Sequence, residues 1–241
     1  MKWSGEPLIE EEVRERAFTI ECEGRNVPGI LWTPTQPAPA SPVVLLGHGG
    51  TLHKRAHYIL ATARRLVRQH GMAAVSIDGP GHGERKERIP EDQDQARADF
   101  VSAWLKPGAN EKIVADWTAT LDAAQAEVGE GPVGYFGLSM GTMMGIPLIA
   151  AEPRIQAAVL GLMGVWGPNR DRLVEDAPKI ACPIRFLAQW NDEVVPRETV
   201  LDLFDRLGSS EKSLRAHPGR HVQVPAPEMR AIADFFASHL K

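Results

Sequence analysis

The nonapeptide VGYFGLSMG, residues 133–141, contains the clearest structural signal in the chain. A short apolar run leads into the pattern Gly-x-Ser-x-Gly, and a helical pattern over Gly141–Ala151 follows it. This order places Ser139 on a sharp, strained turn between a strand and a helix, with its hydroxyl pushed outward. The flanking glycines stay bare because a side chain there would collide with the neighbouring strand or helix. The stretch therefore predicts an accessible serine at one edge of a sheet.

Apolar runs and helical patterns alternate along the rest of the chain. The spacing predicts eight strands, over Ala17–Glu23, Val27–Trp32, Val43–Gly47, Met72–Ile77, Val133–Phe136, Ala157–Leu162, Ile184–Ala188 and Ser213–His217. Further helical patterns cover Ala56–Gln69, Asn110–Val128, Arg197–Leu207 and Pro227–Leu240. Most of the later runs are apolar on both faces, which favours an α/β fold: a mostly parallel eight-stranded sheet with helices on both faces.

The connections between these runs show no domain boundary. The proline-rich stretch Thr33–Pro42 is short and joins two apolar runs, so residues 1–241 are expected to form a single domain. The longer charged excursion over residues 84–108 is a candidate for a small lid or cover.

Composition excludes several classes of protein. The net charge is −4 with both signs mixed along the chain, whereas a nucleic-acid partner needs a basic face. No apolar run reaches the about 18 residues of a membrane span, and the acidic start differs from a signal peptide. We therefore expect a cytoplasmic protein with a small-molecule partner, and a homodimer is compatible with these features. Cys22 and Cys182 are 160 positions apart and are interpreted as buried thiols.

Asp192 is the expected acid partner of Ser139. A serine hydroxyl becomes a strong nucleophile only when a base takes its proton and an acid holds that base. Ligands of such sheets bind at the carboxyl ends of the strands, and Asp192 comes just after the strand expected over Ile184–Ala188. Its neighbour Glu193 is the local rival, but the adjacent position is expected to direct Glu193 elsewhere.

His221 is the expected base. After a serine turn of this kind, the acid comes next along the sequence and the histidine follows the acid. His221 lies after the last expected strand and the turn Pro218-Gly219-Arg220, on the edge where Ser139 is expected. His217 is the alternative base, but it lies inside the strand, where its side chain is expected to form part of the wall of the site.

The sequence Gly47-His48-Gly49-Gly50-Thr51 follows an early buried strand and predicts an oxyanion hole. Bare glycines let the backbone approach a bound carbonyl group. The N–H of Met140, directly after the serine, is one expected donor, and the N–H of Gly50 is the other, with Thr51 as the alternative.

A metal site is not expected. His48, His53 and His57 are spaced by five and four residues, with no carboxylate in a fitting place, so no metal is predicted. Acyl transfer through a serine, a histidine and an aspartate implies no organic cofactor either.

With these residues assembled, the chain resembles a small α/β-hydrolase of the carboxylesterase and dienelactone-hydrolase-like branches, from about residue 17 to the end. The resemblance rests on Gly47–Gly50, Asp78–Gly83, Gly137–Gly141, Asp192 with Val195-Pro196, and Gly219–His221. It implies the α/β-hydrolase fold and a Ser-His-Asp esterase. Only about twenty residues separate Leu162 from Ile184, so the large cap of many relatives is not expected.

The substrate is expected to be an ester of small to medium size and apolar character. Five side chains are candidates to line its pocket: Thr51, Leu52, Trp104, Met163 and Trp166. The same three catalytic groups also suit a thioester, an amide, a carbon–carbon bond or transfer to another acceptor. A non-catalytic binding protein on this fold is the more distant alternative.

Overall fold

The computed structural model describes residues 1–241, except for the side chain of Gln93. Nine strands form one sheet in the order β1-β2-β3-β5-β4-β6-β7-β8-β9. The strands are β1 (Lys2–Glu10), β2 (Val13–Cys22), β3 (Arg25–Pro34), β4 (Val43–Gly47), β5 (Ala73–Ile77), β6 (Val133–Gly137), β7 (Ile155–Gly161), β8 (Ile184–Gln189) and β9 (Lys212–His217). Strands β1, β2, β3 and β5 pair antiparallel, and every other pair is parallel.

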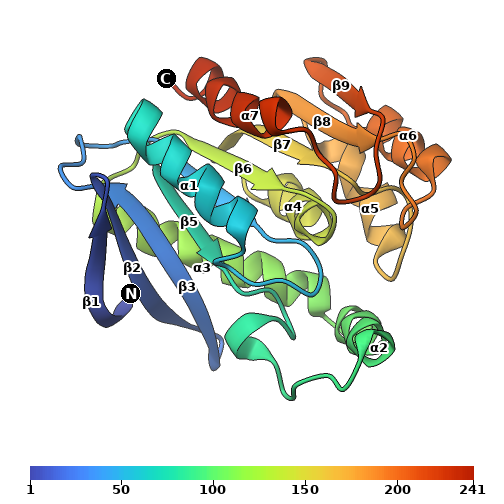
Figure 1. Cartoon of the computed structure of the whole chain (residues 1–241), viewed down its shortest axis with the longest axis horizontal. Coiled ribbons are helices and arrows are strands. Elements are labelled where there is room, and N and C mark those ends of the chain that lie inside the picture. Colours follow the sequence, from blue (N-terminus) through green and yellow to red (C-terminus); the bar gives the residue numbers. More distant parts are fainter.

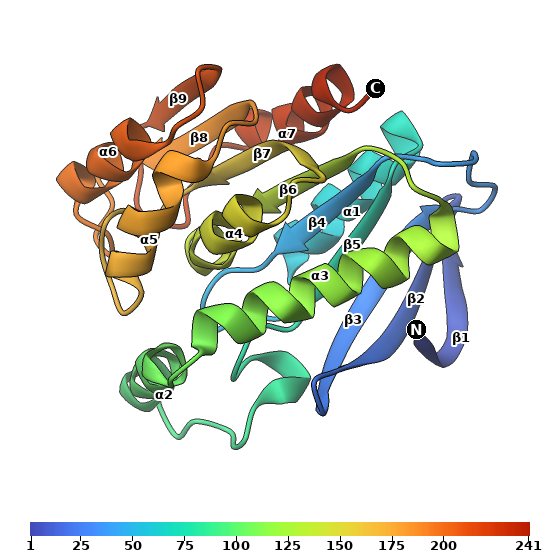
Figure 2. The same ribbon diagram turned by 180° about the vertical axis from the view of Figure 1, so that it is seen from behind.

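Helices cover both faces of the sheet. The helices are α1 (His57–His70), α2 (Gln93–Leu105), α3 (Ala109–Val128), α4 (Met140–Ala151), α5 (Arg170–Asp176), α6 (Arg197–Arg206) and α7 (Ala226–His239). Helices α1 and α7 pack together on one face (Figure 1), and α3, α4, α5 and α6 cover the other (Figure 2). Each face has its own apolar core, and the central strands β4, β5 and β6 are buried at every position. The predicted α/β architecture is therefore confirmed.

Strand β1, which adds a ninth strand to the eight expected, is the main difference from the predicted sheet. Eight of its nine residues are exposed, so no alternation of buried positions marks it in the sequence. Backbone pairing with β2 holds it, and Trp3 packs edge-on against Phe18 with ring centroids 6.2 Å apart. The hairpin turn uses Glu11 and Glu12 at positive φ, where glycine or asparagine would have given a signal.

The excursion over residues 84–108 contains one α-helix, α2, after a charged loop. Asp92 caps α2 by accepting a hydrogen bond from the N–H of Gln95. The ring of Phe100 lies against His82, with centroids 5.9 Å apart, and a Cβ on Gly50 would lie 3.6 Å from that ring. Helix α2 therefore covers the loop after β4. The connection between β7 and β8 contains only α5 and the short 3₁₀ helix η2 (Ala177–Lys179). No described helix is both long and apolar enough to cross a bilayer.

Candidate active site

Ser139 occupies a strained turn between β6 and α4. Its φ of 57° and ψ of −118° lie in a region that side-chain-bearing residues rarely adopt. A Cβ on Gly137 would lie 2.5 Å from the backbone of Gly141, and a Cβ on Gly141 would lie 2.4 Å from the carbonyl oxygen of Gly47. The predicted need for bare glycines is thus confirmed, and the contact brings the end of β4 against the start of α4.

Thr142 fixes this turn to the end of β7. The N–H of Ser139 donates to the carbonyl oxygen of Gly161 over 2.8 Å, and the Thr142 hydroxyl accepts the N–H of Gly161 over 2.9 Å. The same hydroxyl lies 2.7 Å from the Gly161 carbonyl and 2.9 Å from that of Gly137. These contacts hold Ser139 in its unfavourable conformation. A threonine three residues after the serine is the only sequence signal for them.

The structure brings Ser139, Asp192 and His221 together from the ends of β6, β8 and β9. His221 Nε2 lies 3.0 Å from Ser139 Oγ, and His221 Nδ1 lies 2.7 Å from Asp192 Oδ2. Both distances lie within the range of hydrogen bonds. The His221 side chain is 11% exposed, which limits competition from water.

Asp192 is held as a carboxylate. Burial raises its pKa, but hydrogen bonds from His221 and from the N–H groups of Val195 and Val194 outweigh burial and leave that pKa below the ordinary value. An ionised Asp192 only accepts hydrogen bonds, so the proton of a neutral His221 lies on Nδ1. The lone pair on Nε2 then faces the serine hydroxyl, as a general base requires.

His217 and Glu193, the alternative base and acid, make other contacts. His217 Nε2 is 3.1 Å from Glu228 on α7, away from Ser139. Glu193 does not bind the imidazole; its carboxylate accepts the backbone N–H of His221 over 2.9 Å.

The glycine loop, residues 47–54, is oriented by a buried histidine. Burial lowers the pKa of His48 to about 4, so its ring is neutral at ordinary pH. Its Nε2 accepts the N–H of Gly79 over 2.9 Å, so Nδ1 carries the proton and donates to the Gly49 carbonyl over 2.8 Å. The C=O and N–H of a trans peptide point in opposite directions. The N–H of Gly50 is therefore turned away from the imidazole.

Asp78 fixes the other end of the glycine loop. Its carboxylate, fully buried, accepts the Lys54 ammonium over 2.6 Å and the Lys54 backbone N–H over 2.8 Å. Gly49 N–H is held by the Tyr58 hydroxyl over 2.7 Å. No hydrogen bond among the described residues engages the N–H of Gly50 or of Met140, the two expected oxyanion donors. The sequence motif Asp78–Gly83 thus serves to anchor this loop.

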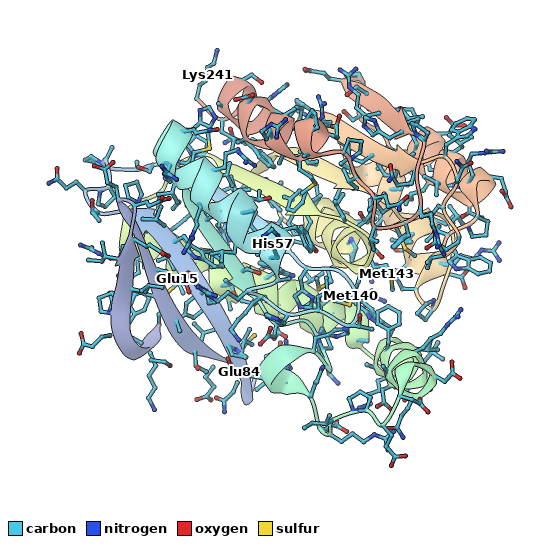
Figure 3. The ribbon with its side chains drawn as sticks, viewed as in Figure 1. Glu15, His57, Glu84, Met140, Met143 and Lys241 are labelled. Atoms are coloured by element: carbon cyan, nitrogen blue, oxygen red, sulfur yellow. The ribbon has the colours of Figure 1, made fainter. Side chains whose placement is uncertain are left out.

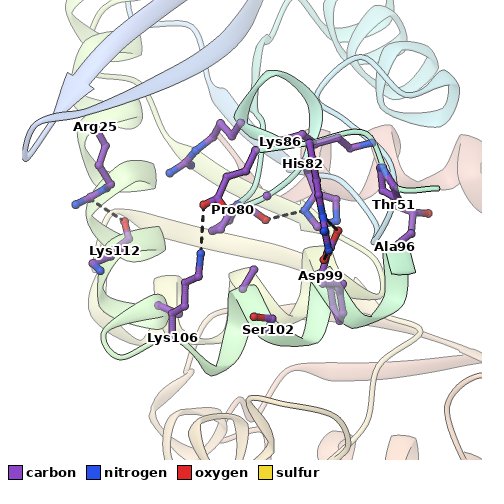
Figure 4. A pocket seen from close by; sticks show the side chains of 18 residues that line it. Arg25, Thr51, Pro80, His82, Lys86, Ala96, Asp99, Ser102, Lys106 and Lys112 are labelled. Carbon is purple, nitrogen blue, oxygen red and sulfur yellow. Dashed lines mark hydrogen bonds and ion pairs between the residues drawn. The ribbon is translucent and has the colours of Figure 1, made fainter. Parts of the chain in front are cut away.

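A cavity of about 490 Å³ lies beside the glycine loop, between the turn at residues 80–82 and α2 (Figure 4). Thr51, His82 and Phe100 line it, and charged side chains such as those of the ion pair Arg88–Asp99 surround it. Of the five predicted pocket residues, only Thr51 lines this cavity. Trp104 and Met163 are buried in the apolar core, and Leu52 and Trp166 are partly exposed.

Figure 3 shows Met140 at the start of α4 and His57 at the start of α1. His48 is buried and already bonded, whereas His57 is exposed. Among the described residues, no group of three or more histidines, cysteines and carboxylates is arranged to hold a metal ion.

Several known proteins are similar to this chain. The chain is similar over its whole length to a cold-adapted esterase from an Arctic intertidal metagenomic library, with 43% identity, full coverage of both chains and a TM-score of 0.90. The fold is also that of an acetyl xylan esterase from Paenibacillus sp. R4 (17% identity, 99% of this chain and 89% of that one, TM-score 0.77). Dienelactone hydrolase from Anabaena variabilis is similar at 20% identity, over 96% of this chain and all of that one, with a TM-score of 0.70. No curated protein matched the sequence. Residues 27–219 match the Dienelactone hydrolase family, so the chain belongs to this family of α/β-hydrolases.

Proposed function

We propose that this enzyme cleaves carboxylic esters of small to medium size through an acyl-enzyme formed on Ser139. Its family and its esterase relative make the chain a hydrolase that acts on ester bonds. The observation that carries the proposal is the chain of two hydrogen bonds, 3.0 Å and 2.7 Å long, from Ser139 through His221 to Asp192.

In the proposed reaction His221 Nε2 takes the proton of Ser139 Oγ while Oγ attacks the ester carbonyl carbon. The carbonyl oxygen becomes an oxyanion, which the N–H groups of Gly50 and Met140 stabilise. His221 then returns the proton to the departing alcohol oxygen, and a water molecule repeats both steps on the acyl-enzyme. Asp192 stays ionised throughout and stabilises the imidazolium.

The cavity beside the glycine loop supports a substrate of limited size through its position next to that loop: Thr51 and Phe100 line it, whereas Ser139 and His221 do not. Its volume of about 490 Å³ falls within the range of small-molecule sites. The ring of Phe100 supplies an apolar contact next to Gly50, and α2 would cover the bound ester.

The test is a Ser139→Ala variant assayed with p-nitrophenyl acetate and with a fluorophosphonate probe. We expect turnover and labelling to disappear together while the circular dichroism spectrum stays unchanged. The matched control is Ser210→Ala, at an exposed loop position, which should keep both. Undiminished hydrolysis by the Ser139→Ala variant would refute the proposal.

A further inference from the structure

We propose that Gln189 and Glu193 are positioning residues, which hold the peptide bond between Arg220 and His221 and thereby set the imidazole against Ser139. This inference rests on the proposed function, because it assigns a role toward the same base.

One peptide group is held at both of its polar atoms. The carbonyl oxygen of Arg220 accepts the Gln189 side-chain N–H over 3.0 Å, and the N–H of His221 donates to Glu193 Oε2 over 2.9 Å. Both side chains come from the carboxyl end of β8, as does Asp192, which binds the imidazole. Three side chains within five residues therefore fix both the ring and the backbone of His221.

The backbone needs this support because regular pairing stops just before it. The parallel ladder of β8 and β9 ends at the pair Gln189 and His217. Two further backbone bonds, from Trp190 N–H to His217 and from Asn191 N–H to Gly219, have lengths of 2.7 Å and 3.1 Å. Beyond them His221 lies in a turn, outside any strand or helix. Side chains must supply the remaining contacts to β8.

The burial of Gln189 is consistent with this role. The residue is 2% exposed, and its Oε1 has no partner among the described residues. Burying this acceptor without a hydrogen bond costs free energy, so the side chain is held at Arg220 despite a desolvation penalty. A Cβ on Gly219 would lie 2.9 Å from the Gln189 amide nitrogen. The glycine of the Gly-Arg-His sequence thus leaves room for the amide that holds the next peptide.

Glu193 contributes a charged acceptor. The hydrogen bond from the His221 N–H is the largest reason why the pKa of Glu193 lies below its usual value. Charge-assisted bonds of this kind are stronger than neutral ones. The second oxygen, Oε1, pairs with the exposed Arg220 side chain over 3.2 Å, a contact at the surface that does not reach His221.

The expected effect on catalysis follows from the reach of the imidazole. A displacement of about 1 Å would break the 3.0 Å bond from Nε2 to Ser139 Oγ, and misplacement on that scale costs up to about 100-fold in rate. Loss of one of the two backbone contacts should lower the rate by a smaller factor, about tenfold.

The experiment compares Glu193→Ala with Glu193→Gln, which retains an acceptor. For Glu193→Ala we expect kcat and the rate constant of fluorophosphonate labelling to fall about tenfold together, with KM within about twofold of the parent value. Glu193→Gln should recover most of the loss, and Gln189→Leu should reproduce it. Arg220→Ala, which keeps the carbonyl group and loses only the surface pair, should have near-parent kcat.

Matched controls are Glu127→Ala and Gln69→Leu, at exposed helical positions far along the chain from β8, which should have no effect. Parent-like kcat in Glu193→Ala would overturn the inference. So would an equal loss in Glu193→Gln, or a change confined to KM. The Glu193 series decides the question even where Gln189→Leu fails to fold. These results leave the Ser139→Ala test untouched, so the positioning role can fail while the proposed function stands.

Discussion

Replacement of Gly141 by alanine tests whether the close contact between the serine turn and the glycine loop is required. The added Cβ would lie 2.4 Å from the Gly47 carbonyl oxygen and 3.0 Å from its carbon. These are backbone atoms, so the two segments must separate by roughly 1 Å to reach ordinary contact distance, and such overpacking costs about 1–3 kcal/mol.

The same separation would move the N–H of Gly50 away from the position proposed for the oxyanion. Loss of one oxyanion donor lowers kcat by about 100- to 1,000-fold, so we expect kcat of Gly141→Ala to fall by about 100-fold with KM little changed. Steady-state kinetics with p-nitrophenyl esters and urea unfolding measure the two effects.

Gly49→Ala is the matched control for stability. Its Cβ would meet no atom closer than 3.6 Å, so its free energy of unfolding should stay within about 0.5 kcal/mol of the parent value. A Gly141→Ala enzyme with parent kcat would refute the reasoning that this contact sets the geometry of the oxyanion hole.

Further predictions concern pH and the anchor of the glycine loop. We expect kcat/KM to fall on acidification, because a general base must be unprotonated to accept the serine proton, and a rate that is flat down to pH 4 would contradict a histidine base. His48 does not produce this fall, since its pKa is lowered to about 4. Hydrogen bonds lower the pKa of Asp192. The ionised side chain therefore stabilises the folded state above the ordinary aspartate pKa, and this contribution is lost as the pH falls through the lowered value. Acid titration followed by circular dichroism measures the loss. Lys54→Met leaves the buried Asp78 without its cation and should cost about 3–5 kcal/mol in urea unfolding, whereas a loss below about 1 kcal/mol would contradict the anchoring role.

The sequence predicted those parts of the fold that depend on burial. Strands β4 and β6 are buried at every position, and their apolar runs mark them within a residue of their observed ends. Strand β1 is exposed along almost all of its length and is held by backbone pairing, which leaves no periodic signal. Helix α2 lies among charged residues whose pattern favours no face.

Chain order and strand ends predicted that Ser139, Asp192 and His221 would meet at one edge of the sheet. The supporting contacts could not be predicted in this way, because they depend on the path of loops. The spacing of His48 in the sequence raises only the question of a metal ligand, whereas its contact with Gly79 joins residues that are 31 positions apart. The sequence predicts that Glu193 points away from the imidazole, but its hydrogen bond with the His221 N–H depends on the loop geometry.

The central claim is that Ser139 becomes acylated during turnover. Acid quenching of the enzyme with a slowly hydrolysed p-nitrophenyl ester, followed by peptide mapping in a mass spectrometer, tests it most directly. We predict one acyl group on the peptide that contains Ser139, and none on that peptide in a His221→Ala variant. Acylation of a different residue, or a burst of p-nitrophenol without any acylated peptide, would contradict the account.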